Sequence, residues 1–170
     1  GHVPGILENF GKDIDLAELN AVPPKGVVGR YIGWGISALV IGLIITGFFQ
    51  SGGEASLNMI KWWVLVNGIL AGLGALAVLA HPLTILASIA AAPLTSINPM
   101  IAAGWVAGLT EAALKRPQVK DFMDLKTDIA SVRGFWHNKI TRILLLIMFV
   151  NIGSALGTFL AIPLMMRFLN

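Results

Sequence analysis

The side chains that could carry out acid–base or metal chemistry are few in this sequence and stand far apart. The histidines are His2, His81 and His137, and there is no cysteine. The lack of cysteine excludes disulfides, thiolate metal sites and cysteine nucleophiles. A catalytic metal site needs about three protein ligands around one ion, and no second ligand stands near His2. The sequence also has no HExxH, GxSxG or phosphate-binding loop, so we expect no catalytic residue in this chain.

Uncharged polar side chains are the remaining candidates for a site. No Asp, Glu, Lys or Arg occurs between Trp62 and Thr110, whereas proton relays and ion pathways inside membranes usually contain ionisable groups. This disfavours a pump or a proton-coupled carrier. Hydrogen bonding between helices is the simpler role for the uncharged groups, and substrate binding is the alternative. The polar residues that could surround a break between helices are Asn67, Thr95, Ser96, Asn98 and Asn151.

The elements that position these residues belong to a membrane protein. Of the 170 residues, 56% are hydrophobic and only 12% are charged, about half the charged share of a soluble domain. The net charge of +3 is too small to indicate nucleic-acid binding. The basic residues instead stand beside apolar segments, as the positive-inside rule expects. We therefore expect a multi-pass protein of the cell membrane with the lipid bilayer as its partner.

The apolar pattern predicts an all-α membrane protein. Residues 1–28 are interpreted as the remnant of a soluble domain and a linker, and residues 29–170 as a transmembrane helical domain. Three full transmembrane helices are expected at about 30–50, 60–81 and 142–163. Seven basic residues occur from Lys115 to Arg142, and residues 117–140 within this stretch have apolar side chains at helical spacing. This predicts an amphipathic helix along the membrane surface.

A broken helical hairpin is predicted between the second and third spans. Prolines interrupt helices, so Pro93 and Pro99 divide this segment into half-helices at about 83–93 and 99–114. Asn98 is expected to cap the second half-helix, with Pro99 as its first residue. The hairpin could be re-entrant or could cross the membrane. Glu111, which stands four residues before Lys115, is expected to form a structural ion pair with it.

Pairs of glycines four residues apart recur in the apolar segments. Such pairs let helix backbones approach closely in a membrane, which favours a tightly packed bundle. The pairs are Gly29/Gly33, Gly68/Gly72, Gly104/Gly108 and Gly153/Gly157.

Several longer strings of this sequence resemble the TraB family, also called pheromone shutdown proteins, in its archaeal branch. The resemblance runs through nearly the whole chain, from Gly1-His2-Val3-Pro4 to Gly153-Ser154-Ala155-Leu156-Gly157. Its most distinctive strings are Ala92-Pro93-Leu94-Thr95-Ser96-Ile97-Asn98-Pro99 and Ala102-Ala103-Gly104-Trp105-Val106-Ala107-Gly108.

The resemblance implies a two-part protein. In this family an N-terminal Tiki-like domain, proposed to be a metal-dependent protease or hydrolase, precedes a C-terminal membrane domain. Gly1-His2 resembles the end of a family GxxH motif, which would make His2 a metal ligand whose partners are missing here. The resemblance thus implies a divalent metal for the full-length protein, whereas we expect no cofactor in this chain.

Three functions are consistent with these observations. The first is anchoring and organising the chain's own N-terminal hydrolase domain, with no chemistry in the membrane part. The second is a conduit or peptide-binding cavity centred on the break at Thr95 to Asn98. The third is a homo-oligomeric scaffold that uses the glycine faces.

Overall fold

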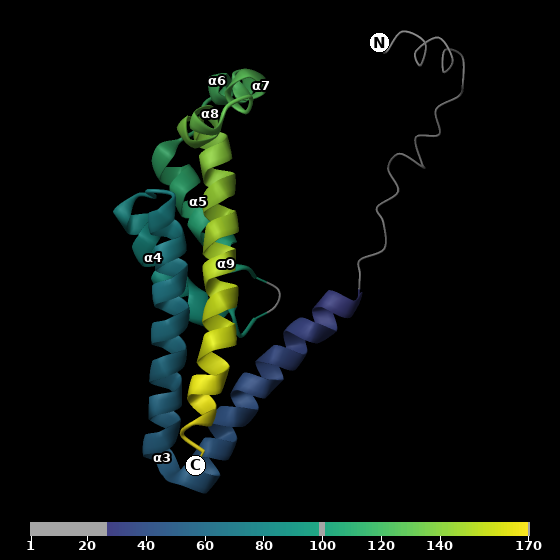
Figure 1. Ribbon diagram of the computed structural model, residues 1–170, viewed down its shortest axis with the longest axis vertical. Coiled ribbons are helices and arrows are strands. Elements are labelled where there is room, and N and C mark those ends of the chain that lie inside the picture. Colours follow the sequence, from purple (N-terminus) through teal and green to yellow (C-terminus); the bar gives the residue numbers. More distant parts are fainter. Residues whose placement is uncertain (1–26, 99–100, 170) are drawn as a thin grey trace, which may run out of the picture.

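The computed structural model describes residues 27–98 and 101–169, and every regular element in these two ranges is an α-helix (Figure 1). The proposed remnant of a soluble domain and His2 lie outside the described residues. Two helices of the described part are long and apolar enough to cross a membrane, over residues 31–77 and 139–166. Three separate full transmembrane helices, as the sequence predicted, are therefore not confirmed.

The first two predicted spans form one helical element, α3 (Val27–Ala77), with a sharp bend at Gly52. Gly52 has φ 84° and ψ 176°, a conformation that costs glycine little because it lacks a Cβ atom. The bend divides α3 into a first limb, residues 27–51, and a second limb, residues 53–77 (Figure 1). The Ser56 hydroxyl donates a hydrogen bond of 2.9 Å to the Ile44 carbonyl and joins the two limbs.

The broken hairpin consists of α4 (Pro82–Thr95) and α5 (Ala103–Lys115). Two predicted details are wrong. Pro93 lies inside α4, since a proline removes only one N–H donor and the helix continues to Thr95. Helix α5 begins at Ala103 with Ala102 as its N-cap, so Asn98 does not cap it; the predicted first residue, Pro99, lies outside the described residues.

The predicted surface helix is also wrong. Residues 117–140 instead contain three short helices, α6 (Val119–Met123), α7 (Leu125–Asp128) and α8 (Val132–His137). The chain turns tightly between α7 and α8, where a Cβ atom on Gly134 would overlap the Asp128 carbonyl. Asn138 then caps α9 (Lys139–Met166), which contains the predicted last span. At 28 residues α9 is about 42 Å long, enough for a hydrocarbon core of about 30 Å.

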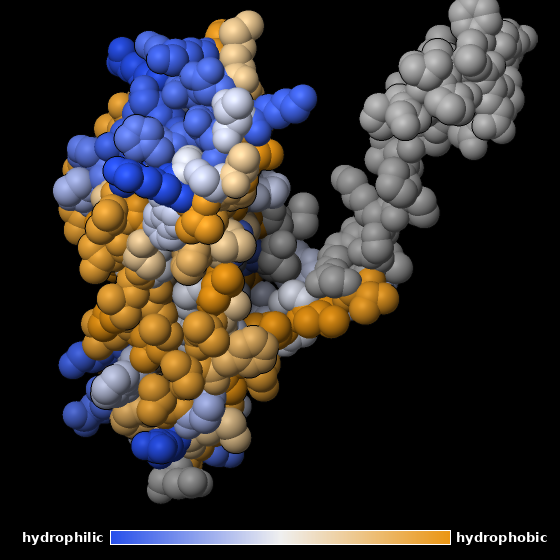
Figure 2. All heavy atoms as spheres, turned by 45° about the horizontal axis from the view of Figure 1, so that its top comes forward, coloured by the Kyte–Doolittle hydropathy of each residue, from blue (hydrophilic) through white to orange (hydrophobic). Residues whose placement is uncertain are grey.

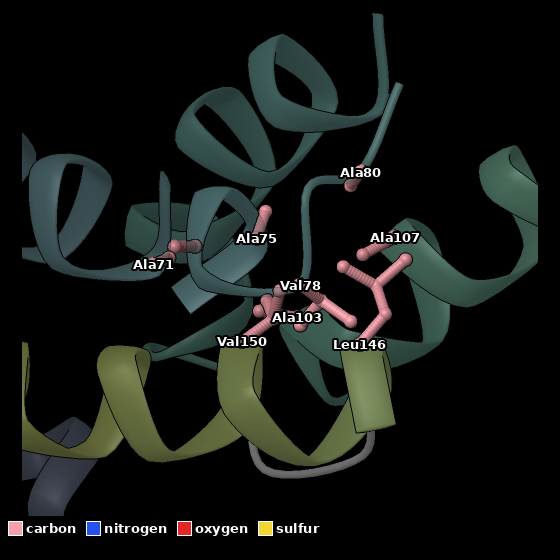
Figure 3. Close-up of a cluster of buried hydrophobic side chains, with 9 residues drawn as sticks. Ala71, Ala75, Val78, Ala80, Ala103, Ala107, Leu146 and Val150 are labelled. Carbon is pink, nitrogen blue, oxygen red and sulfur yellow. The ribbon is translucent and has the colours of Figure 1, made fainter. Parts of the chain in front are cut away.

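Small residues fill the space where the helices meet. The main buried cluster joins α3, α4, α5 and α9, and six of its nine members are alanine, at positions 71, 75, 80, 92, 103 and 107 (Figure 3). Glycine faces lie against the neighbouring helices. Gly68 and Gly72 meet Ile89 of α4, Gly104 and Gly108 meet Ile147 of α9, and a Cβ on Gly157 would lie 2.8 Å from the Asn67 Cα. Three of the predicted glycine pairs thus pack helices together. The fourth pair, Gly29/Gly33, is not tested, because the surroundings of Gly29 are not described.

The bundle consists of two similar helical hairpins. Gly68-Ile69-Leu70-Ala71-Gly72-Leu73 on α3 and Gly104-Trp105-Val106-Ala107-Gly108-Leu109 on α5 share the pattern G-x-x-A-G-L. The first pattern packs on Ile85 and Ile89 of α4, and the second on Ile143 and Ile147 of α9. Helix α3 also contacts α9, and α4 contacts α5. The second limb of α3 with α4, and α5 with α9, are therefore similarly packed pairs.

The outside of the bundle has an apolar belt with a hydrophilic end. In Figure 2 hydrophobic residues cover most of the length of the helices, and hydrophilic residues gather over the end that carries α6, α7 and α8. We call this end the capped end. It holds the C-terminal end of α3, the start of α4, the end of α5 and the start of α9 (Figure 1).

Candidate functional site

Four polar side chains meet at the break in the hairpin, and we call them the tip cluster: Asn67, Ser96, Ser154 and Thr158. The Ser96 hydroxyl lies 3.1 Å from Asn67 Oδ1 and 2.9 Å from the Ser154 hydroxyl. Thr158 donates a second bond of 3.2 Å to the same Asn67 oxygen. Asn67 is fully buried, so the cluster lies inside the protein. It joins α3, the end of α4 and the middle of α9.

The other predicted residues of the break have separate roles. Thr95 donates to the carbonyls of Ala91 and Ala92 in its own helix, at 3.0 and 3.2 Å. Asn151 of α9 accepts a 2.8 Å bond from the Gly104 amide and so satisfies the first turn of α5. Asn98 is exposed in the loop. The structure thus brings Asn67 and Ser96 together and places Thr95, Asn98 and Asn151 outside the tip cluster.

Two further side chains bind carbonyl groups freed by the break. The Trp63 indole N–H donates to the Pro93 carbonyl at 3.0 Å, and the Ser37 hydroxyl donates to the Ile97 carbonyl at 2.6 Å. Buried backbone groups without partners cost free energy, and these bonds remove that cost. Neither role was predictable from the sequence, because Trp63 resembles an interfacial anchor and Ser37 resembles a small packing residue.

A second polar group lies at the capped end, around the turn between α3 and α4. Glu111 of α5 is only 2% exposed, and its carboxylate accepts bonds from the His81 amide at 3.0 Å and the Thr84 hydroxyl at 2.6 Å. Glu111 therefore bonds the N-terminal turn of α4, where a negative charge is favourable. The predicted ion pair with Lys115 is not formed, since the Lys115 side chain is exposed and Glu111 points into the bundle.

Arg142 of α9 holds the other side of the same turn. Its Nε donates to the Val78 carbonyl at 3.1 Å, and its terminal nitrogen donates to the Leu79 carbonyl. These carbonyls follow the end of α3, where a cation is favourable. Leu79 itself has φ 52°. One anion and one cation from different helices thus fix the turn, an arrangement that the spacing of Glu111 and Arg142 could not reveal.

The polar groups of the described residues are used for structure. None of their fully buried side-chain oxygen or nitrogen atoms is without a hydrogen-bond partner. Within the described ranges no three His, Asp or Glu side chains come close enough to hold a metal ion. His81 accepts a bond from the Leu83 amide at the start of α4, and His137 is exposed at the end of α8. In this geometry the polar side chains hold helices in place.

Comparisons with known proteins indicate the family. Residues 28–170 match the family described as "TraB family protein, C-terminal domain". An uncharacterized protein of Methanocaldococcus jannaschii is 31% identical over all of this chain and 45% of its own length. A TraB domain-containing protein of Bos taurus is 36% identical over 32% of this chain and 15% of its own length, and one of Mus musculus is 33% identical over 35% and 16%. The chain thus spans less than half of each of these relatives. No solved structure matches it.

Proposed function

Because this chain belongs to the TraB family, whose C-terminal domain it matches over residues 28–170, we propose that it is a multi-pass membrane domain that anchors and organises the hydrolase domain of the full-length protein. In this proposal both limbs of α3 and all of α9 cross the bilayer, and the α4–α5 hairpin enters and leaves at the capped end. The N-terminal domain would be a metal-dependent hydrolase that acts on peptides such as pheromones. The membrane part would hold it beside the membrane.

The observation that carries this proposal is how the polar groups of the bundle are used. The tip cluster, Trp63, Ser37 and Asn151 all bond to other parts of the bundle. Glu111 and Arg142 bond to the turn between α3 and α4. Because these polar groups bond to one another inside the bundle, they favour the role of a rigid anchor for another domain.

A conduit or peptide-binding cavity at the break is the alternative. The break between α4 and α5 favours it, because half-helices that end inside a bundle commonly surround substrate sites in transporters. A site of this kind needs polar groups directed at the substrate. In this bundle the Ser96 hydroxyl is already engaged by Asn67, Ser154 and the Ala92 carbonyl, which supports the anchor.

Exchange of the membrane domain distinguishes the two functions. In the full-length protein, residues 28–170 are replaced by unrelated transmembrane helices of the same topology, and peptidase turnover is measured in membranes. If the domain is an anchor, turnover persists with the foreign helices and membrane attachment is lost when residues 28–170 are deleted. Loss of turnover with the foreign helices, together with loss after Ser96→Leu in the native domain, would instead support the conduit.

A further inference from the structure

The three short helices of the capped end have no counterpart in the first hairpin. We call residues 118–137 the cap. In the first hairpin α3 and α4 are joined by a short turn in which Leu79 has φ 52° and His81 is the N-cap of α4. In the second hairpin Arg116 has φ 45° and Asn138 is the N-cap of α9, with the cap between them. Equivalent hairpins thus close with and without a cap, so closing the hairpin does not explain it.

The charges of the cap are segregated. Its three acids, Asp121, Asp124 and Asp128, are half-buried. Asp121 accepts from the Gln118 amide at 2.6 Å, and Asp128 accepts from the Asn138 side chain at 2.9 Å. Its cations are exposed. They are Lys120, Lys126 and Arg133, with Lys115 and Arg116 exposed at the end of α5. In and beside the cap, five exposed cations thus stand against three half-buried acids, and Figure 2 shows hydrophilic residues concentrated at this end.

Large apolar side chains stand among these cations. None of the residues in α6, α7 and α8 is buried. The most exposed apolar side chains of the cap are Val119, Phe122, Met123 and Val132, each at least 62% exposed. Water disfavours such side chains, whereas the boundary between lipid headgroups and acyl chains accommodates apolar and cationic groups together.

A groove connects the cap with the apolar belt of the bundle. It has a volume of about 280 Å³ and is lined by residues 129–132, Phe135, Trp136 and, on α9, Leu145. The Trp136 ring lies 6.4 Å from the Phe149 ring of α9. Leu144 and Met148, which flank Leu145 in the sequence of α9, are exposed. An acyl chain that runs along α9 can therefore reach the groove without leaving an apolar surface.

We propose that the cap is a binding surface for anionic phospholipids, with an acyl chain in the groove and the headgroup on the exposed cations. This inference rests on the proposed membrane function and names the lipid class that the capped end selects. Charge complementarity supports an anionic headgroup, because clusters of Lys and Arg beside a span attract anionic lipid. The continuity of the groove with the lipid-facing side of α9 supports a lipid over a soluble protein partner.

Fluorescence quenching by brominated lipids tests the proposal. The chain has no cysteine, so Ala130→Cys gives a single attachment site for a fluorophore at the groove. The labelled chain is placed in nanodiscs of phosphatidylcholine with a minority of phosphatidylglycerol, and bromine is carried by only one lipid at a time. Phosphatidylglycerol is expected to quench on the order of twofold more than its share of the lipid predicts. Added salt should lower this excess, because it screens exposed charges.

Charge variants and a second label provide matched controls. Substitution of Lys120, Lys126 and Arg133 by glutamine should abolish the excess, whereas Lys61→Gln with Arg167→Gln, outside the cap, should leave it unchanged. A label on Ser51→Cys, at the bend of α3, should be quenched by each lipid in proportion to its amount. Circular dichroism confirms that each variant keeps its helices.

The remaining outcomes separate this proposal from the proposed function. Proportional quenching by both lipids at residue 130 would overturn the anionic site and leave the membrane domain intact. Quenching at residue 51 without quenching at residue 130 would show that the cap stands away from the bilayer and suits a protein partner, which also overturns the proposal. No quenching at either residue would contradict membrane insertion itself.

Discussion

At the scale of single residues, Glu111 is the buried charge that the structure explains most directly. Its carboxylate accepts bonds from the His81 amide and the Thr84 hydroxyl. Glu111→Ala leaves both donors buried without a partner, so we expect a loss of about 1–3 kcal/mol in the free energy of unfolding. Glu111→Gln keeps an acceptor oxygen and should lose less. Reversible unfolding in detergent micelles measures both values.

A control and a double variant test this explanation. Thr110 neighbours Glu111, but its hydroxyl donates only to the Val106 carbonyl of the same helix, so Thr110→Ala should change stability little. Combining Glu111→Ala with Thr84→Val should cost less than the sum of the two single changes, because the pair interacts directly. Additive costs would show that the bond to Thr84 contributes nothing to stability.

Asn138 is the residue that ties the cap to the bundle. Its Oδ1 accepts from the amides of Ile140 and Thr141 at the start of α9, and its Nδ2 donates to the Asp121 carbonyl and the Asp128 carboxylate. Asn138→Ala should cost about 0.5–2 kcal/mol, the usual penalty for loss of an N-cap. It should also raise amide hydrogen exchange in α6 and α7, which mass spectrometry can follow.

Asn138→Asp separates the two roles of this side chain. Aspartate is as good an N-cap as asparagine, but it cannot donate a hydrogen bond and it faces the Asp128 carboxylate. We expect the start of α9 to keep its protection from exchange while α6 and α7 lose theirs. Equal protection of the cap in Asn138→Asp and the unmodified chain would refute the proposed tie.

At the scale of elements, the close approach of α3 and α9 depends on glycine. A Cβ atom on Gly153 would overlap the Leu70 carbonyl, and the Cα of Ala71 lies 3.1 Å from the same position. Both neighbours are backbone and cannot rotate away. Gly153→Ala should therefore destabilise the bundle by about 1–3 kcal/mol, as overpacking typically does, in the same unfolding assay.

Gly42→Ala provides the matched control. Gly42 also lies within α3, but no atom comes within 4 Å of the position of its Cβ. Alanine has the higher helix propensity by about 1 kcal/mol, so this change should be neutral or stabilising. A comparable loss in both variants would mean that the cost of Gly153→Ala does not come from the contact between α3 and α9.

At the scale of the whole molecule, the bonds at the capped end predict the membrane topology. The turn between α3 and α4 and the start of α9 lie together there, whereas the bend at Gly52 lies at the opposite end (Figure 1). Cysteines at Leu79 and Lys126 should react with a membrane-impermeant reagent from the same side, and a cysteine at Ser51 from the other. Opposite accessibility of Leu79 and Lys126 would exclude a re-entrant hairpin.

The equivalence of the two hairpins gives a further prediction at this scale. Removal of residues 118–137 leaves Arg116-Pro117-Asn138, which corresponds to Leu79-Ala80-His81 of the first hairpin. The shortened chain should keep its helix content and unfold cooperatively, because α5 and α9 retain their glycine contacts. An unfolded or aggregated product would show that the cap is needed for the bundle.

The sequence by itself determined the helical class, the approximate apolar segments and the glycine pairs that pack helices. These features depend on composition and on spacing within one segment, which the sequence contains directly. It also predicted an interruption between Pro93 and Pro99, because prolines and polar residues mark it; the interruption between α4 and α5 runs from Ser96 to Ala102. The bend at Gly52 falls between the first two predicted spans, where glycine interrupts the apolar pattern.

Only the tertiary structure decided which groups meet across the bundle. Glu111 has Lys115 at helical spacing, yet it bonds residues 27 and 30 positions away, because burial against α4 gives it two donors that solvent-exposed Lys115 could not replace. The surface helix fails as a prediction because helical periodicity persists across the turns that Ser131 and Asn138 cap. The start of α5 was misplaced for a related reason: a facing helix supplied its hydrogen bond through Asn151, so no local cap was required.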